Sequence, residues 1–209
     1  HEPLPDKIVI FNPKPDKMRK LLIFGSIALL FVWWLSSSYN RLVSKNEEAN
    51  AAWQNVESDY QRRLDLIPNL VSTVKGYADF EKSTLEAVVQ ARAQATQVKF
   101  DASNLNKENL QKFQEAQGAV SSSLSRLLVT VEQYPNLKAN QNFLELQAEL
   151  TGTENRIKVS RNNFNEAVKN YNLSVKSFPT NIMASMFGFQ ARAYFESDAG
   201  AEKAPKVEF

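Results

Sequence analysis

Apolar residues recur along most of the chain at alternating spacings of four and three, the pattern of helices that pack lengthwise against partners. Such seams mark residues 49–77, 108–134 and 139–176, and a further helix with an apolar run is predicted over residues 82–98. The positions of the first seam are Ala49, Trp53, Val56, Tyr60, Arg63, Ile67, Leu70, Val74 and Tyr77. No segment alternates with the period of two that a half-buried strand shows.

Turn-forming residues and prolines separate these seams. Ser83 and Glu86 fit a capping box at the start of the second helix, and residues 99–107 read as a loop. Pro135 ends the third helix and Phe178-Pro179 ends the fourth, after which a short helix covers residues 182–186. The aromatic residues that follow are expected to cover one end of the bundle; they are Phe187, Phe189, Tyr194 and Phe195.

The pattern predicts an all-α fold: an elongated antiparallel bundle of three to four long helices with one N-terminal transmembrane helix. At a rise of ~1.5 Å per residue, the first and fourth helices are each roughly 55 Å long. Helices of that length joined by short turns stack antiparallel. Residues 39–196 form this bundle in our interpretation, and residues 197–209, which have little to bury, form a mobile tail.

The transmembrane helix is predicted at residues 18–38, around the apolar run from Leu21 to Leu35. The run alone rises only about 22 Å, and the serines after it bring the span closer to the ~30 Å of a bilayer core. A buried core helix or a cleaved signal peptide would show a similar pattern. The predicted anchors at the membrane interfaces are Lys17, Arg19, Lys20, Trp33, Trp34 and Tyr39.

Basic residues flank this segment unequally. Lys14, Lys17, Arg19 and Lys20 precede it, whereas Arg41 and Lys45 follow it and are soon met by two glutamates. The positive-inside rule therefore predicts a cytoplasmic N-terminus and a helical domain on the extracytoplasmic side.

Residues 1–17 contain four prolines, which preclude a helix and favour extended backbone. Met18 resembles the ordinary start of a membrane-anchored protein, so this segment is either an extension or part of a chain whose true start is missing. We expect a flexible tail; the alternative is an arm that docks on a neighbour through the apolar residues 8–11.

Composition removes most kinds of chemistry. The chain has no cysteine, one histidine at position 1, six scattered glycines and a net charge of +2. These counts argue against thiol chemistry, histidine-containing metal clusters, phosphate loops and nucleic-acid binding. A Ser–Lys dyad and metal binding by carboxylates such as Glu145 and Glu149 stay open from sequence alone. We predict no catalytic residue, no cofactor and no metal site.

One cluster of charged residues surrounds a proline within the first helix. Arg62, Arg63, Asp65, Pro68 and Asn69 are the candidate partner-binding or kink-stabilising residues. Pro68 removes a backbone donor and predicts a kink near Asp65. In the structural interpretation, Arg63 or Asp65 satisfies the freed backbone groups, or pairs with Glu154 or Arg156 on a facing helix. In the functional interpretation, the cluster recognises a partner protein.

The longest motifs resemble the LemA family. They are QRRLDLIPNLVSTVKGYADFEKSTLEAVVQAR at 61–92 and LLVTVEQYPNLKANQNFLELQAELTGTENRIKVSRNNFNEAVKNYN at 127–172, with Tyr39-Asn40, Val56-Glu57 and Phe178-Pro179 beside them. The resemblance covers about residues 18–196 and implies a bacterial membrane protein with one N-terminal transmembrane helix and a long helical bundle. It implies no activity and no catalytic residues. Phe80 stands where the family usually has histidine, which argues against a required histidine there.

The first functional hypothesis is therefore a membrane-anchored helical scaffold of the cell envelope, a protein-interaction module that self-assembles. Its expected partners are membrane lipid, other membrane or envelope proteins and further copies of itself. The alternative is a membrane-organising or membrane-shaping protein, since a relative is associated with building magnetosome membranes. An enzyme ranks last, because it would need a concave pocket lined by converging polar groups.

Overall fold

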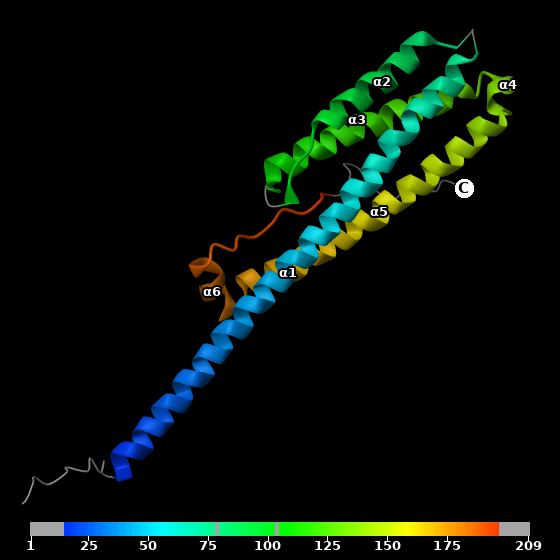
Figure 1. The fold of residues 1–209 in the computed structure, drawn as a ribbon. Coiled ribbons are helices and arrows are strands. Elements are labelled where there is room, and N and C mark those ends of the chain that lie inside the picture. Colours follow the sequence, from blue (N-terminus) through cyan, green and yellow to red (C-terminus); the bar gives the residue numbers. More distant parts are fainter. Residues whose placement is uncertain (1–14, 78–79, 103–104, 197–209) are drawn as a thin grey trace, which may run out of the picture. The chain divides into compact units, whose positions relative to one another are not determined.

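The computed structural model describes residues 15–77, 80–102 and 105–196, and within these residues every regular element is a helix (Figure 1). The all-α class predicted from the pattern is confirmed. The helices are α1 Pro15–Lys75, α2 Lys82–Gln97, α3 Lys107–Val131, α4 Pro135–Lys138, α5 Gln141–Lys176 and α6 Thr180–Met186. The predictions for residues 1–14 and 197–209 fall outside the described residues.

The chain divides into two compact units, of which the first ends at Arg41 and the second begins at Leu42. The described part of the first unit is the N-terminal stretch of α1, which is long and apolar enough to cross a membrane. Only 6% of its most apolar window is buried. Large side chains such as Leu21, Phe24 and Leu29 are more than two-thirds exposed, as lipid-facing residues of a span would be.

The second unit packs its helices side by side, and contacts between side chains fix their directions. Trp53 of α1 touches Phe113 and Phe164, whereas Arg63, further along α1, bonds to Gln117 and Glu154. Residue numbers therefore rise together along α1 and α3, and in opposite directions along α1 and α5. α3 packs against α2 and runs antiparallel to it (Figure 1).

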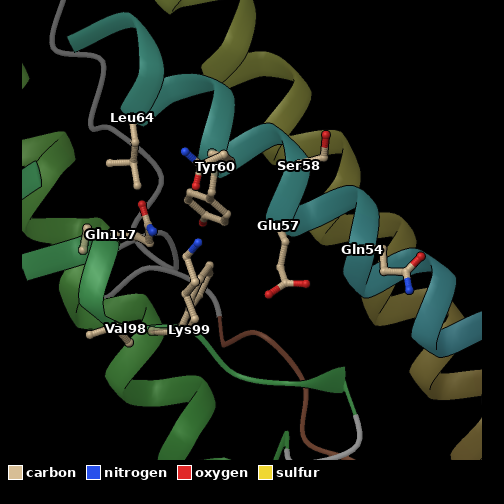
Figure 2. A pocket seen from close by; sticks show the side chains of 11 residues that line it. Gln54, Glu57, Ser58, Tyr60, Leu64, Val98, Lys99 and Gln117 are labelled. Atoms are coloured by element: carbon tan, nitrogen blue, oxygen red, sulfur yellow. The ribbon is translucent and has the colours of Figure 1, made fainter. Parts of the chain in front are cut away.

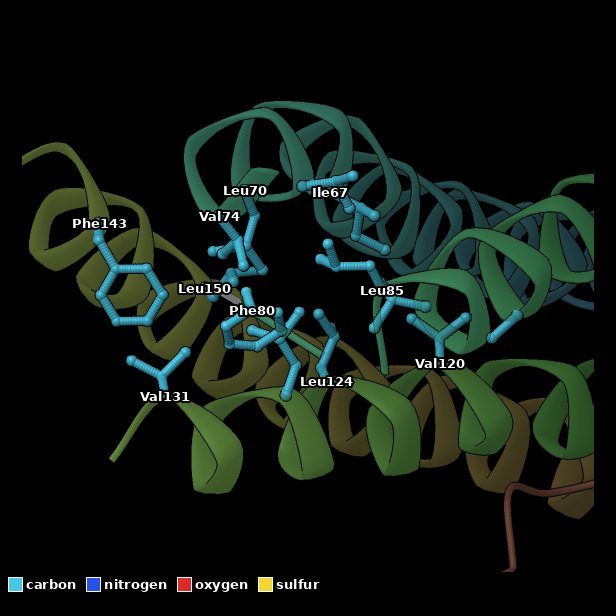
Figure 3. Packing of buried hydrophobic residues seen from close by; sticks show 14 of the residues in the cluster. Ile67, Leu70, Val74, Phe80, Leu85, Val120, Leu124, Val131, Phe143 and Leu150 are labelled. Carbon is cyan, nitrogen blue, oxygen red and sulfur yellow. The ribbon is translucent and has the colours of Figure 1, made fainter. Parts of the chain in front are cut away.

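A leucine-rich cluster fills one half of this unit (Figure 3). It joins the C-terminal part of α1 to α2, α3, α4 and the start of α5. Its buried members are Leu64, Ile67, Leu70, Val71, Val74, Phe80, Leu85, Val88, Ala91, Ala95, Val120, Leu124, Leu127, Val131, Leu137, Phe143 and Leu150. At ~25 cal/mol per Å² of apolar area removed from water, this is the main source of stability in that half.

An aromatic cluster fills the other half. Its buried members are Ala49, Trp53, Val56, Tyr60, Leu105, Leu110, Phe113, Ile157, Phe164, Val168 and Phe195. The Trp53 ring centroid lies 5.1 Å from that of Phe113 and 5.5 Å from that of Phe164, in edge-to-face geometry. Both clusters use the predicted seams: every position of the first seam from Ala49 to Val74 is buried.

The second helix spans nearly the predicted residues 82–98, but the predicted capping box at its start is wrong. Glu81 is the N-cap residue, and it accepts a hydrogen bond from the Ser83 hydroxyl. The predicted end of the third helix at residue 134 is also wrong. The third helix ends at Val131, and Pro135 starts the short helix α4 because its fixed φ suits a first helical position. Asparagine side chains cap α3 and α5, through Asn106 and Asn140.

Candidate functional site

The charged cluster beside Pro68 does not converge on one site. Arg63 points into the bundle and is 1% exposed, whereas Arg62, Asp65 and Asn69 lie on the exposed surface of α1. Their spacings of three and four place these exposed residues on one helix face, which we call the polar face of α1. Asp65 accepts a hydrogen bond from Gln61 within α1, at 2.7 Å.

Arg63 links three helices through its guanidinium. Nη1 donates to the Ser121 hydroxyl and to the Glu154 carboxylate, both at 2.7 Å, and Nη2 donates to the backbone carbonyl and side-chain carbonyl of Gln117. The guanidinium also lies 5.0 Å from the Tyr60 ring centroid. Of the pairings open to Arg63 from sequence, the one with Glu154 is present. Arg63 sits between Tyr60 of the aromatic cluster and Leu64 of the leucine-rich cluster, as a polar layer between two apolar ones.

The backbone group freed by Pro68 has a partner that sequence reasoning did not name. Pro68 has no N–H to donate to the carbonyl of Leu64, and Arg92 of α2 donates its Nε–H to that oxygen at 2.8 Å. We expected Arg63 or Asp65 to do this, but Arg63 turns toward α3 and α5, and Asp65, as an acceptor, bonds to Gln61. α1 continues past Pro68 to Lys75.

A cavity of about 350 Å³ opens beside Arg63, between α1, α3 and the segment after α2 (Figure 2). Its lining residues are Gln54, Glu57, Ser58, Tyr60, Gln61, Leu64, Ala95, Val98, Lys99, Phe113 and Gln117. Glu57 and Lys99 point into it from opposite walls, whereas the Ser58 hydroxyl points away from Lys99. A Ser–Lys dyad is therefore not assembled here, although the cavity does gather polar groups.

Burial raises the pKa of Glu57 above its ordinary value, and the nearby Asp101 carboxylate acts in the same direction. The Trp53 indole and the Lys99 ammonium oppose this shift. The indole N–H is itself directed at the backbone carbonyl of Phe100, at 3.3 Å. The described residues contain no group of three or more histidines, cysteines or carboxylates that could hold a metal.

A second polar site binds the chain's own extended segment, residues 189–196, which we call the C-terminal strap. Asn172 of α5 accepts a hydrogen bond from the backbone N–H of Arg192 at 2.8 Å and donates one to its carbonyl at 2.9 Å. Asn165 makes the same two bonds to Phe195, at 2.8 and 3.1 Å. The two asparagines are seven residues apart on a helix, about 10.5 Å, and three extended residues span about 10 Å. The strap therefore lies antiparallel to α5 with matched spacing.

The side chains of the strap reinforce this attachment. Phe195 is buried against Trp53, with ring centroids 6.0 Å apart, and Arg161 lies 5.0 Å from the Phe195 ring. The expectation that the tail aromatics cover one end of the bundle is wrong. Phe195 enters the side of the aromatic cluster, whereas Phe187 and Tyr194 are exposed.

Arg192 ties the strap to α1 as well. Its Nη2 donates to the side-chain oxygens of Asn46 and Asn50, at 2.8 and 2.7 Å, and its guanidinium lies 5.4 Å from the Tyr171 ring centroid. Burial lowers the pKa of Arg192, and Tyr171 and Glu47 oppose that shift. Sequence reasoning did not identify Arg192, Asn165 or Asn172. The sequence pattern that could have indicated them is the seven-residue spacing of Asn165 and Asn172, each of which directly follows a buried seam residue of α5.

The predicted membrane-interface anchors lie on α1. Lys17, Arg19 and Lys20 are exposed before the apolar run, and Trp33, 70% exposed, and Trp34, half-buried, lie near its end. Tyr39 is exposed beyond them. This order along the helix is that of a membrane span with basic residues at one end and aromatic residues at the other.

An exposed apolar helix joined to an all-helical unit defines a membrane-associated helical protein. Comparison with known proteins gives the family: residues 52–209 match the LemA family model, and the chain belongs to the LemA family.

Named relatives agree with this assignment. The magnetosome protein MamQ 1 of Paramagnetospirillum magneticum is 27% identical over 84% of this chain and 71% of its own length. MamQ of Magnetospirillum gryphiswaldense is 26% identical over 95% of this chain and 82% of its own. Protein LemA of Metamycoplasma hominis is 24% identical over 90% of this chain and 84% of its own length.

Proposed function

We propose that this protein is a membrane-anchored helical scaffold of the bacterial cell envelope that assembles with copies of itself and does not catalyse a reaction. The observation that carries the proposal is that the charged and polar residues near Pro68 divide between the interior and the surface of the bundle. Arg63 makes its hydrogen bonds inside the bundle. The polar face of α1, by contrast, lies on the surface; it consists of Arg62, Asp65 and Asn69. Arg62 approaches Glu149 only to 4.0 Å, so its charge is available to another molecule.

The test is the mass of the protein extracted in native-membrane nanodiscs. Replacing Arg62, Asp65 and Asn69 together by alanine should shift the assembly toward smaller species and leave helicity unchanged. Arg63 stays in place because its loss would disturb the fold. A matched control replaces Asn155, Lys158 and Asn162, exposed on α5 with the same spacing. Assembly that survives the first triple, or falls equally with both, would contradict a role for this face.

For topology, we propose that the helical unit lies on the extracytoplasmic side, on the basis of the basic residues before the span. The chain has no cysteine, so a single introduced cysteine is the one site in the protein that a maleimide can label. In intact cells, a membrane-impermeant maleimide should label Val129→Cys and not Asp16→Cys. The reverse pattern would place the helical unit in the cytoplasm.

A membrane-organising role is the second candidate, favoured by the relatives named magnetosome proteins. It predicts that purified protein clusters in liposomes or changes their shape. Liposomes unchanged at high protein density would count against it.

A further inference from the structure

We propose that α6 forms a second membrane contact, separate from the span, in which its outer side lies in the headgroup region of the lipid bilayer. The outer side of α6 carries Ile182 and Met186, which are 50 and 71% exposed, and we include in it Phe178 and Phe187, which flank the helix and are 80 and 55% exposed. The opposite side carries Met183 and Ala184, which are buried at 3 and 1%. The proposal rests on the membrane association of the chain.

The exposed apolar residues lie close together along the chain. Ile182 and Met186 are four residues apart on α6, an interval that keeps side chains on one side of a helix. Phe187 directly follows the helix, and Phe178 precedes its N-cap residue, Pro179. A short helix with one side anchored in the protein and an apolar side facing outward has the form of an interfacial membrane element.

Hydrogen bonds place α6 at a definite end of the second unit. Asn172 binds the backbone of Arg192, and the Arg192 side chain reaches Asn46 of α1, so that these residues lie at one level. α5 runs antiparallel to α1 and ends four residues beyond Asn172, about 6 Å further toward Leu42. α6 therefore starts close to the level of Leu42, where the second unit begins.

Chain length connects this end of the unit to the membrane. Leu35 is the last residue of the apolar run, and seven residues later the chain has reached Leu42. However the two units are arranged, seven residues span at most about 25 Å. The outer side of α6 is thus tethered within reach of the bilayer surface from which the chain emerges.

The size of the apolar surface favours lipid over a second copy of the protein. The four side chains expose roughly 500 Å² together. A stable protein interface takes about 800 Å² from each partner. An interfacial helix, by contrast, needs only to bury an apolar side some 5–10 Å into the headgroup region.

The experiment uses the full chain with single cysteines, which the absence of native cysteine allows. Ile182→Cys and Met186→Cys report on the outer side of α6, Leu30→Cys on the apolar run, and Val129→Cys on an exposed apolar position at the other end of the unit. Val74, near that end, is about 42 Å along α1 from Asn46. Each variant carries an environment-sensitive fluorophore and is reconstituted sparsely into phosphatidylcholine vesicles. Nitroxide lipids labelled at the headgroup or at mid-chain then quench it.

We expect headgroup nitroxides to quench the labels at 182 and 186 several-fold more than the label at 129, and more than mid-chain nitroxides do. Mid-chain nitroxides should quench the label at 30 most. Raising the salt concentration should leave the α6 quenching unchanged, because the contact is apolar. Circular dichroism checks that all four variants retain their helicity.

Three outcomes would overturn the proposal. Quenching at 182 and 186 equal to that at 129 means that α6 stays in water. Labels that are shielded equally in detergent and unquenched by lipid mean that protein covers α6. Loss of quenching at 30 as well would mean that the chain is not inserted, a failure of membrane anchoring that is distinguishable from failure at α6 alone.

Discussion

The leucine-rich cluster and the aromatic cluster share α1, α3 and α5, yet they are closed by different means. The first is built from side chains of α1, α2, α3, α4 and α5, with Phe80 as the one buried member that lies outside a helix. The second is closed by Phe195, from an extended segment that follows α5 by some twenty residues and is held through its backbone. Helix packing closes the first cluster, whereas the segment that closes the second is held in place by a few polar side chains. Arg63 lies between them.

Arg63→Ala should have the largest effect, because it disturbs both clusters. It leaves the buried Gln117 amide and carbonyl without their donor and opens a cavity, for an expected loss of about 4 kcal/mol in the free energy of unfolding. Urea unfolding measures it. Arg62→Ala is the control: its side chain is largely exposed and its ion pair is weak, so a loss above about 0.5 kcal/mol would contradict this account.

Leu127→Ala tests the leucine-rich cluster. Leu127 is fully buried, and its truncation should cost about 3 kcal/mol in a single transition that lowers the stability of the whole unit. Thermal unfolding followed by circular dichroism measures the shift. Val129→Ala, two residues away on the exposed side of α3, should leave the midpoint nearly unchanged.

Phe195→Ala tests the aromatic cluster by the same kind of truncation. The expected loss is about 2 kcal/mol, below the usual range for phenylalanine, because the strap can detach and no closed cavity need remain. Trp53 fluorescence should shift to the red while helicity persists. If helicity were lost together with the fluorescence change, the aromatic cluster would unfold as cooperatively with the rest of the unit as the leucine-rich cluster does, which would contradict this expectation. Tyr194→Ala, exposed on the same strap, is the control.

Asn172→Ala and Asn165→Ala test whether these two side chains hold the C-terminal strap against α5. Each removes two hydrogen bonds to strap backbone and should cost about 1–2 kcal/mol. Hydrogen exchange should accelerate at the Arg192 amide in the first variant and at the Phe195 amide in the second. Asn163→Ala, exposed on the same helix, should change neither amide. Unchanged exchange in both variants would show that the asparagines do not hold the strap.

The smallest effect belongs to Glu57→Gln. Burial raises the pKa of Glu57 in the folded protein above its ordinary value of 4.5, so ionisation is disfavoured by folding. Its stabilising contribution is present below pH 4.5 and is lost as the pH rises through the raised pKa. The glutamine variant should therefore unfold at a higher urea concentration than the native chain at pH 7, and the gain should vanish near pH 4. Glu115→Gln, for which no such burial applies, is the control.

Periodicity was enough to predict the long helices and their buried seams, because these depend on spacing along one helix. It left the Arg63–Glu154 pair as one of several alternatives and did not indicate the bonds of Arg63 to Ser121 and Gln117. It could not predict that Arg92 satisfies the Leu64 carbonyl, since that contact depends on how α2 rotates against α1. The attachment of the strap to α5 was not predicted, for another reason. An extended segment held by its backbone leaves almost no pattern in its own sequence, and the signal lies in Asn165 and Asn172, in another element.

The match between seven helical residues and three extended ones has a consequence for how this chain can change length over evolution. Inserting one residue between Arg192 and Phe195 would move one of them about 3.4 Å off its asparagine, beyond hydrogen-bonding range. Inserting one in α5 between Asn165 and Asn172 would turn one asparagine by about 100° around the helix. Insertions and deletions should therefore be tolerated in the turns and at the chain ends, while these two intervals keep a fixed length.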